Sequence, residues 1–363
     1  MYTGKIAVAY LGNNNPYKFK RGVENVIESQ AACFDYGTKY YIFFDNKQSV
    51  FRWKDIICIG IKNNAWKYLV LNLIIGKLKK KTKLVIHSHG PVKTISLLYR
   101  TDLLTVHDAI YYQRKGNGQR FNKVFYLVER YAYLLSRRIQ FISEYSIKQS
   151  LADRLSKKID IIYNTSFLED YILNDDNAAL KDSGDDLTYT LFAVRGIQKR
   201  TRIDLLIDFA EYVKDKSLKG KSIEVIVAGK GPLLQHYSDE IRKRGLTNIH
   251  LLGFIPDNEL IKYYKHCDAV IMPCEHAEGF GLPIIEGYMF GKPVYGSNKC
   301  AIPEIIYSKE YLFENSPESI YDTLERTHES KVDFRQFYNK KYSFASFRKQ
   351  MAGLYDKICV RYT

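Results

Sequence analysis

The chain has 363 residues, of which 46% are hydrophobic and 26% charged, and its formal net charge is +15. This length accommodates two ordinary domains, and the composition excludes an intrinsically disordered chain. The basic excess lies entirely in residues 1–165, which hold 28 Lys and Arg against 11 Asp and Glu, whereas residues 166–363 hold 27 against 29. A basic half-molecule indicates an anionic partner, namely nucleic acid, a membrane surface or a phosphorylated substrate, although solvated lysines alone would give the same charge.

Cysteine spacing and hydropathy narrow the class of protein further. The six cysteines are scattered and none forms a C-x-x-C pair, which indicates buried thiols in a reducing compartment rather than a disulfide framework or a zinc site. No basic segment followed by a long apolar core opens the sequence, so we expect no signal peptide. The longest apolar stretch, residues 66–76, is too short to span a bilayer. We therefore expect a cytoplasmic protein.

Short apolar runs alternate with helical patterns along the first half of the chain. Strands are expected at 5–11, 39–44, 56–60, 83–89, 103–107, 139–143 and 159–164, with amphipathic helices among them at 22–34 and 122–137. Continuous apolar strands separated by helices predict a parallel sheet that is covered on both faces.

The second half repeats this alternation after an interruption. Residues 166–188 are acidic and polar without lasting periodicity, which predicts a linker. Strands are then expected at 189–194, 223–229, 249–254, 269–273 and 293–297, and helices at 203–215, 235–243, 258–266 and 283–290. The sequence thus predicts two doubly wound α/β domains. Ligands of such sheets bind outside the carboxyl ends of the strands, and two facing domains would place a site in the cleft between them.

The loop and helix that follow the fourth of these strands carry paired carboxylates. Gly279 and Gly281 allow the backbone to approach a ligand closely, and the helix that begins near Pro283 offers free N–H groups and a positive dipole end to a diphosphate. Glu286 lies about one turn inside that helix, where it could accept hydrogen bonds from ribose hydroxyls, and Glu278 could bind a second sugar. The spacing alone is equally compatible with a glycine-rich turn that carries surface glutamates.

The span EGFGLPIIE, residues 278–286, resembles the E-x7-E motif of retaining glycosyltransferases with the GT-B fold, specifically the large family 4, the glycosyl transferases group 1. The following GKPVYGSN and the preceding residues 251–274 resemble the same family. Weaker landmarks occur in order in the first half, in RGVEN, HSHG, VHDA, FISEYS and IIYNTSF. The resemblance implies two Rossmann-like domains facing across a cleft, with an acceptor-binding domain at 1–165, a nucleotide-sugar-binding domain at 189–341 and a C-terminal helix within 342–363 that crosses back.

The resemblance also implies roles for the carboxylates and for a basic segment. Glu286 would hold the ribose, Glu278 the donor hexose, and the backbone N–H groups near Phe280, Gly281 and Leu282 the phosphates and sugar. The segment AVRGIQKRTR, residues 193–202, resembles the family's arginine followed by a lysine, cations that neutralise the departing diphosphate. Arg195 matches the arginine. Lys199, Arg200 and Arg202 compete for the second place, and we favour Lys199 and Arg200. The alternative is a solvated basic loop.

Three further places in the sequence complete the expected site. His107 ends a predicted strand, and in the family a histidine there lies beside the anomeric centre; the alternative is a structural hydrogen bond. His87 and His89 are interpreted as scaffold beside the cleft. Gly12 begins the loop after the first strand, although the family's glycine pair is incomplete around Gly22. The residues expected at the nucleotide-sugar are Gly12, Arg200, Gly229, Phe254, Ile255, Gly279, Phe280, Gly281, Leu282 and Glu286, and the catalytic ones are His107, Arg195, Lys199 and Glu278.

The implied reaction is hexosyl or N-acetylhexosaminyl transfer with retention at the anomeric carbon. The acceptor would attack from the front face while the departing phosphate acts as base. The chain contains no D-x-D, in agreement with an enzyme that needs no metal and no cofactor besides its donor. A uridine donor is favoured, although the base contacts around residues 253–255 do not resolve uridine from guanosine.

Residues 66–83 combine an apolar helical run with a lysine cluster. Such a segment can lie in a membrane interface, and it can equally be a buried helix followed by a basic turn. Together with the basic first half, the resemblance favours a lipid-linked saccharide acceptor, surface polysaccharide or O-antigen assembly, and contact with the inner face of the plasma membrane. The rival interpretations are a non-enzymatic anion- or nucleic-acid-binding protein, for which no recognised nucleic-acid motif is present, and a nucleotide-sugar epimerase of the same fold.

Overall fold

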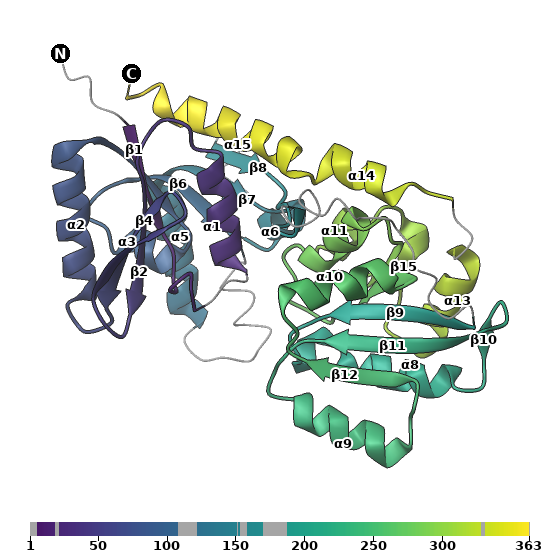
Figure 1. Cartoon of the computed structure of the whole chain (residues 1–363). Helices are drawn as coiled ribbons and strands as arrows, with labels where there is room; N and C mark the ends of the chain where they lie inside the picture. The colour runs from purple at the N-terminus through teal and green to yellow at the C-terminus, as the bar shows by residue number, and fades with distance from the viewer. Residues whose placement is uncertain are drawn as a thin grey trace. The chain divides into compact units, whose positions relative to one another are not determined.

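A computed structural model describes residues 6–18, 22–107, 122–150, 152, 158–169, 187–327 and 331–362. The chain divides into two compact units (Figure 1). Unit 1 comprises Met1–Thr165 and Phe344–Thr363, and unit 2 comprises Ser166–Ser343. Most of the expected linker, residues 170–186, lies outside the described residues.

Unit 1 is built on an eight-stranded sheet whose strand order is β3-β4-β2-β1-β5-β6-β7-β8. Its strands are β1 (Ile6–Leu11), β2 (Lys39–Asp45), β3 (Ser49–Trp53), β4 (Ile56–Lys62), β5 (Lys83–Ser88), β6 (Thr101–Val106), β7 (Ser136–Phe141) and β8 (Ile159–Ile161). All neighbours are parallel except β3, which pairs antiparallel with β4. Without β3, the first six parallel strands follow the doubly wound order 3-2-1-4-5-6 in chain sequence.

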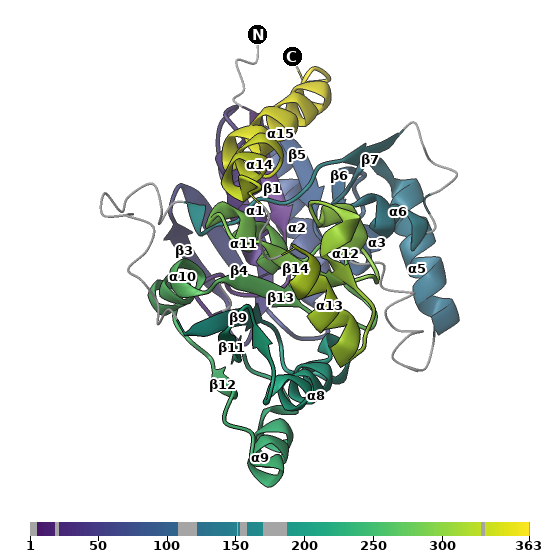
Figure 2. The same ribbon diagram turned by 90° about the vertical axis from the view of Figure 1, so that its right-hand side faces the viewer.

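Helices cover both faces of this sheet. They are α1 (Val23–Ala32), α2 (Lys67–Lys81), α3 (Pro91–Ile95), α5 (Asn122–Leu135), α6 (Glu144–Lys148) and α15 (Phe344–Cys359). The buried side chains of α15 recur at helical spacing, at Phe347, Met351, Leu354, Tyr355 and Ile358, and join α1 in one apolar cluster on the sheet. The opposite face buries Leu71 and Ile75 of α2, and Figure 2 shows α5 and α6 beside β7.

Unit 2 contains a seven-stranded sheet with strands β9 (Thr188–Val194), β10 (Ser217–Leu218), β11 (Lys221–Ala228), β12 (Ile249–Gly253), β13 (Ala269–Met272), β14 (Val294–Ser297) and β15 (Leu312–Phe313). Its parallel strands run β12-β11-β9-β13-β14-β15, again 3-2-1-4-5-6 in chain order. The helices are η2 (Lys199–Thr201), α8 (Ile203–Val213), α9 (Leu234–Arg244), α10 (Asp257–His266), α11 (Leu282–Met289), α12 (Ile302–Ile305), η3 (Lys309–Tyr311), α13 (Pro317–Thr327) and α14 (Phe334–Lys341).

The differences from the sequence prediction have physical causes. The helix expected at 122–137 ends at Leu135, because Ser136 already begins β7 and pairs with Thr101. The antiparallel strand β3 was not expected, since its side chains alternate between half-buried and exposed and it carries no continuous apolar run. In the described part of the chain, no helix is both long and apolar enough to cross a membrane.

Candidate functional site

Each doubly wound sheet has one place where the strand order reverses, and ligands bind at the carboxyl ends of the strands there. In unit 2 this place lies between β9 and β13, which pair through Leu191 and Ala269. Arg195 directly follows β9, and the loop that contains Glu278 follows β13. In unit 1 the corresponding place lies between β1 and β5. The topology therefore brings the predicted catalytic residues of unit 2 to one edge of one sheet.

Arg195 is buried, with only 5% of its side chain exposed. Its Nη1 donates to Oε2 of Glu278 at 3.0 Å, whereas its Nε and Nη2 are buried and have no hydrogen-bond partner among the described residues. Buried donors without acceptors are costly, more so on a charged group. A guanidinium presents its donors in a planar fork that matches the oxygens of a phosphate or carboxylate. The unused edge of Arg195 is therefore suited to an anion.

Gly229 explains how this arginine is held. Its backbone N–H donates to the carbonyl of Gly253 at 2.7 Å, and its φ is 147°. A Cβ at Gly229 would collide with the backbone carbonyl of Arg195, whose own N–H donates to Ala228 at 2.9 Å. The glycine thus permits two strand ends to approach closely, and its described contacts are to the backbone of the protein.

Glu278 faces two arginines. Its Oε2 lies 3.0 Å from Arg195 and 3.7 Å from Nη1 of Arg200, and Arg200 also donates to the carbonyl of Ala277 at 3.1 Å. Ala277 has a φ of 59°, a left-handed conformation that is costly for a residue with a side chain. Arg200 therefore braces the loop in addition to pairing with the carboxylate. Each carboxylate oxygen has two acceptor sites, so Glu278 keeps capacity for a hydroxyl donor.

The three cations expected to act together with Arg195 have different partners in the structure. Arg202 pairs with Asp204 and Glu275, each at 2.9 Å, and these pairs raise its pKa even though burial lowers it. Arg200 faces Glu278. Lys199 is exposed in η2 and forms no ion pair with the described residues. Arg202 is thus engaged in ion pairs with Asp204 and Glu275, Arg200 is paired with Glu278, and Lys199 forms no ion pair with the described residues.

The loop enters α11 through Gly281, whose φ is 95°. A Cβ there would lie 2.9 Å from the side chains of Met272 and Ile284, so the position requires glycine on two grounds. Phe280 is buried, which leaves its backbone rather than its ring to meet a ligand. Leu282 begins the helix, and its N–H has no partner within the helix. Pro283 carries no N–H, and the N–H of Ile284 donates to the carbonyl of Gly281 at 2.9 Å.

Glu286 is buried inside α11 and both of its carboxylate oxygens accept hydrogen bonds. Ser166 Oγ donates to Oε1 at 3.1 Å, and Tyr264 OH donates to Oε2 at 2.7 Å. The Tyr264 ring is itself fixed, since it stacks on Phe290 with centroids 5.2 Å apart and meets Phe192 edge to face. These hydroxyls hold the carboxylate in one orientation.

At the corresponding edge of unit 1 lie Gly12 and His107. A Cβ at Gly12 would collide with the ring of Tyr41, so this glycine lets the loop after β1 cross an aromatic side chain. His107 is partly exposed, and its Nε2 lies 3.0 Å from Nδ1 of His89. Burial lowers the pKa of His107 to about 4 and that of His87 to about 3. The histidines of this edge are therefore neutral at pH 7.

Residues 180–343 match the family described as Glycosyl transferases group 1. This segment is therefore similar to the group 1 glycosyltransferase domain. The chain is 27% identical to an uncharacterized glycosyltransferase of Methanocaldococcus jannaschii over 252 residues. This aligned region covers 66% of this chain and 64% of that protein. It is 32% identical over 82 residues to the D-rhamnosyltransferase WbpZ of Pseudomonas aeruginosa (22% of each chain) and 34% identical over 98 residues to the serotype-specific mannosyltransferase WbdA of Escherichia coli (26% of this chain, 12% of that one). The matches thus span less than two thirds of these relatives' lengths.

Solved structures match nearly the whole chain. Sucrose-phosphate synthase from Thermosynechococcus elongatus has a TM-score of 0.73 at 14% identity and covers 98% of this chain and 99% of its own. Anabaena HepE, solved in complex with UDP and glucose, has a TM-score of 0.71 at 13% identity, with 97% and 99% covered. These similarities show that the fold is that of GT-B glycosyltransferases, as predicted.

The segment that matches the group 1 family, residues 180–343, contains every predicted site residue except Gly12 and His107. Among them Phe254 is exposed and lies under Nζ of Lys230, 4.7 Å from its ring centroid, whereas Ile255 is buried. Sequence analysis missed Ser166 and Tyr264, the partners of Glu286. Tyr264 carries no signal of its own because an aromatic residue on an amphipathic helix is usually core.

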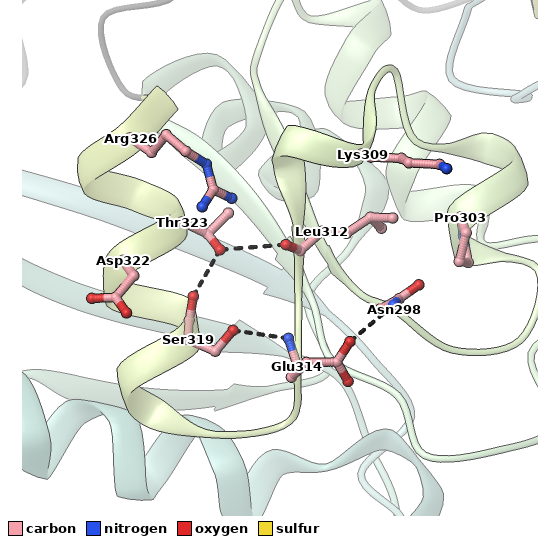
Figure 3. A pocket seen from close by; sticks show the side chains of 9 residues that line it. All are labelled: Asn298, Pro303, Lys309, Leu312, Glu314, Ser319, Asp322, Thr323 and Arg326. Carbon is pink, nitrogen blue, oxygen red and sulfur yellow. Dashed lines mark hydrogen bonds between the residues drawn. The ribbon is translucent and has the colours of Figure 1, made fainter.

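A separate pocket of about 410 Å³ lies in the same domain (Figure 3). It is lined by Asn298, Pro303, Lys309, Leu312, Glu314, Ser319, Asp322, Thr323 and Arg326, none of which is a predicted site residue. Its buried hydroxyl, Thr323 Oγ1, donates to Ser319 O at 2.7 Å. Side chains of both charges line the pocket, so it offers no net attraction to an anion.

Neither a disulfide nor a metal cluster marks the described residues. All six cysteines are free thiols, and all but Cys300 are buried. In the described part of the chain, no group of three or more His, Cys, Asp or Glu side chains is arranged to hold a metal ion.

Proposed function

We propose that the protein is a glycosyltransferase that moves a hexosyl group from a nucleoside diphosphate sugar to a saccharide acceptor. The observation that carries this proposal is Arg195, a buried guanidinium that pairs with Glu278 and has two nitrogens without a partner among the described residues. A diphosphate would satisfy those nitrogens and accept from the N–H of Leu282 at the helix start. The group 1 match over residues 180–343 supports the same assignment.

Each step of the transfer has a residue in this arrangement. Arg195, with Lys199 and Arg200, stabilises the charge that develops as the diphosphate departs. Glu286 accepts from the ribose hydroxyls and Glu278 from a hexose hydroxyl. The acceptor attacks from the face that the diphosphate leaves, its proton passes to a phosphate oxygen, and the anomeric configuration is retained. We propose that this reaction requires no metal, which predicts that EDTA leaves the rate unchanged.

The donor is proposed to be a UDP-sugar, and HepE, a structural neighbour, has been solved with UDP-glucose. Phe254, exposed at the end of β12, offers a ring on which a planar base could stack. The names of the curated relatives specify mannosyl and rhamnosyl transfer, so sugars of these classes are the first to be tested. The acceptor is proposed to be a lipid-linked saccharide in surface polysaccharide or O-antigen assembly.

Helix α2 supports contact with a membrane surface. One face packs on the sheet, while Trp66, Leu69 and Leu73, spaced at i, i+3 and i+7, are more than half exposed. The exposed Lys77 and Lys80 continue the same stripe toward the end of the helix. An exposed apolar stripe that ends in lysines is suited to the interface of an anionic bilayer.

The proposal is tested by nucleotide binding. Melting temperatures are measured with UDP, GDP, ADP and their sugar conjugates, because a ligand that binds only the folded state raises the melting temperature. We expect one nucleoside diphosphate to stabilise the wild type and Lys309→Gln, a variant in the separate pocket, but not Arg195→Gln. Stabilisation of Arg195→Gln equal to that of the wild type, or no nucleotide effect on the folded wild type, would overturn the proposal.

A further inference from the structure

Three histidines converge at the ends of β5 and β6. The rings of His87 and His89 have centroids 4.5 Å apart, and those of His89 and His107 are 5.3 Å apart with an interplanar angle of 24°. His87 and His89 are buried, whereas His107 is partly exposed. The three rings thus form a short stack that reaches from the core of unit 1 to its surface.

His87, the inner ring, is fully satisfied. Its Nε2 lies 2.7 Å from Oγ1 of Thr105 and its Nδ1 lies 3.1 Å from the hydroxyl of Tyr355. Tyr355 in turn lies 2.9 Å from the hydroxyl of Tyr10. A ring whose two nitrogens both have partners is fixed in position, so His87 is a rigid support for the ring stacked on it.

The two ring nitrogens of His89, the middle ring, have different surroundings. Its Nδ1 lies 3.0 Å from Nε2 of His107, but its Nε2 is buried and has no hydrogen-bond partner among the described residues. One nitrogen of a neutral imidazole carries a proton and the other accepts. A proton on the isolated Nε2 would be a buried N–H without an acceptor, and such orphan donors are rarer in proteins than unsatisfied acceptors. The stable arrangement therefore puts the proton of His89 on Nδ1.

This arrangement dictates the state of His107. If His89 donates from Nδ1, then Nε2 of His107 is the acceptor, and the proton of His107 is on its own Nδ1. That Nδ1 has no hydrogen-bond partner among the described residues, and the side chain is partly exposed. Burial also keeps the pKa of His89 well below its usual range, with the neighbouring His87, His107 and Lys93 acting in the same direction. The hydrogen bond thus joins two neutral rings.

We propose that His89 is a positioning residue that holds the His107 ring and fixes it as the Nδ1–H tautomer, so that His107 offers a hydrogen-bond donor to a sugar oxygen. This role rests on the proposed glycosyl transfer and on the expected place of His107 beside the anomeric centre of the sugar. It deepens that proposal, because His107 in this tautomer donates a hydrogen bond and leaves proton removal from the acceptor to the departing phosphate. The hydrogen bond between the two rings involves only side chains of the protein, so it can be examined without substrate.

The tautomer can be read directly in the free protein. Long-range proton–nitrogen NMR correlations on histidine labelled with nitrogen-15 distinguish protonated from bare ring nitrogens, and the signals are assigned with His89→Asn and His107→Gln. We expect His107 to show a protonated Nδ1 and a bare Nε2 at pH 7. A protonated Nε2, or an average of both tautomers, would overturn the proposal whether or not the protein transfers sugars.

A pair of substitutions separates positioning from packing. Asparagine at position 89 places an amide where Nδ1 of His89 now lies, whereas glutamine places it near Nε2, although glutamine is closer to histidine in volume. Loss of one hydrogen bond corresponds to about 0.5–1.5 kcal/mol, so His89→Gln should lower kcat roughly 2- to 12-fold with the KM for the donor unchanged. His89→Asn should retain most of the wild-type kcat.

A lower kcat in His89→Asn than in His89→Gln would overturn the proposal. Equal losses of kcat in the two variants, in proportion to their losses in melting temperature, would show that His89 only fills space and would also overturn it. Failure of the proposed function is a different result. It would be seen as absent nucleotide binding in a folded wild type that still shows the predicted His107 tautomer.

Discussion

The two sheets share one strand order, yet their ligand-binding edges have opposite electrostatic character. At the edge of unit 2, Arg195 and Arg200 each lie within 4 Å of Glu278, and two nitrogens of Arg195 have no partner among the described residues. At the equivalent edge of unit 1, His89 and His107 share a hydrogen bond between neutral rings. One edge is suited to an anionic group and the other to neutral hydroxyls, which is the division that transfer from a diphosphate sugar to a saccharide requires.

The half of the chain with the larger positive net charge is not the half that contains the proposed anion site. Residues 1–165 hold the entire basic excess, whereas residues 166–363, which contain Arg195, are nearly neutral. A single buried cation with unused donors binds a phosphate more tightly than many solvated lysines, because its charge acts in a medium of lower dielectric constant. The surface charge of the first half bears instead on encounter with an anionic surface.

The largest effect on activity is expected when Arg195, the buried cation at the edge of unit 2, is replaced. Arg195→Gln keeps a donor for Glu278 but removes the charge, and loss of one preorganised group of this kind typically costs 10²- to 10³-fold in rate. We expect a loss of at least 100-fold in kcat/KM, measured by release of the nucleoside diphosphate from the donor sugar. Lys309→Gln serves as the control and should retain the wild-type rate. A loss below about 3-fold in Arg195→Gln would mean that the charged edge does not bind the leaving group.

A smaller effect is expected at the support of Glu286. Tyr264→Phe deletes the hydroxyl that donates to Oε2 at 2.7 Å, and a hydrogen bond to a charged group contributes about 1.5–3 kcal/mol. We expect a rise of at least about 10-fold in the dissociation constant of the nucleotide, measured by titration calorimetry.

The adjacent Tyr263→Phe is the matched control. Tyr263 stacks on Phe192 with centroids 5.3 Å apart, and its hydroxyl forms no hydrogen bond with the described residues. The 2′-deoxynucleotide should bind wild type and Tyr264→Phe with similar affinity if Glu286 holds the ribose. Equal losses in the Tyr263 and Tyr264 variants would assign the effect to ring packing instead.

The sequence predicted the architecture well because its signals are local. Continuous apolar strands and intervening helices define both sheets, and Gly281 is recognisable since a turn before a helix requires its φ of 95°. The partners of the site are long-range and leave no such signal. Ser166 lies 120 residues from Glu286 and Tyr264 lies 22 residues away, and nothing in their neighbourhoods distinguishes them from other polar or core residues.

The histidines show the same limit. A strand-end histidine was recognisable at position 107, but His89 was interpreted as scaffold. Its Nδ1 meets His107 only because β5 and β6 pair side by side, through His87 and Leu103. Register, rather than residue type, therefore gives His89 its place.

The neutral state of the unit 1 edge can be tested by pH. In the folded protein the pKa of His87 is about 3 and that of His107 about 4, whereas both are near 6.5 in the unfolded chain. Between about pH 6.5 and pH 4 the unfolded state binds more protons, so the free energy of unfolding falls as the pH is lowered through this window. Each histidine contributes at most about 1.4 kcal/mol per pH unit.

Urea unfolding at several pH values measures this slope. We expect His107→Gln to reduce it by close to one proton, and His236→Gln, at an exposed position, to leave it unchanged. A slope in His107→Gln equal to that of the wild type would show that His107 is charged or solvated in the folded protein, and the contrast between the two edges would be lost.

The smallest effect is expected at α2. Its substitutions test whether the basic surface of the first half binds a membrane rather than the nucleotide. Lysines near an anionic membrane contribute about 1 kcal/mol each, so Lys77→Gln should weaken binding to phosphatidylserine vesicles about 5-fold in a flotation assay at physiological salt. Leu73→Ser should weaken it as well, whereas Val50→Ser, at an exposed apolar residue on β3, should not. The membrane variants should retain wild-type nucleotide affinity, because the proposed nucleotide site around Arg195 lies in unit 2. If Lys77→Gln lowered nucleotide affinity instead of vesicle binding, the basic half would be part of the donor site, and the assignment of opposite roles to the two halves would be wrong.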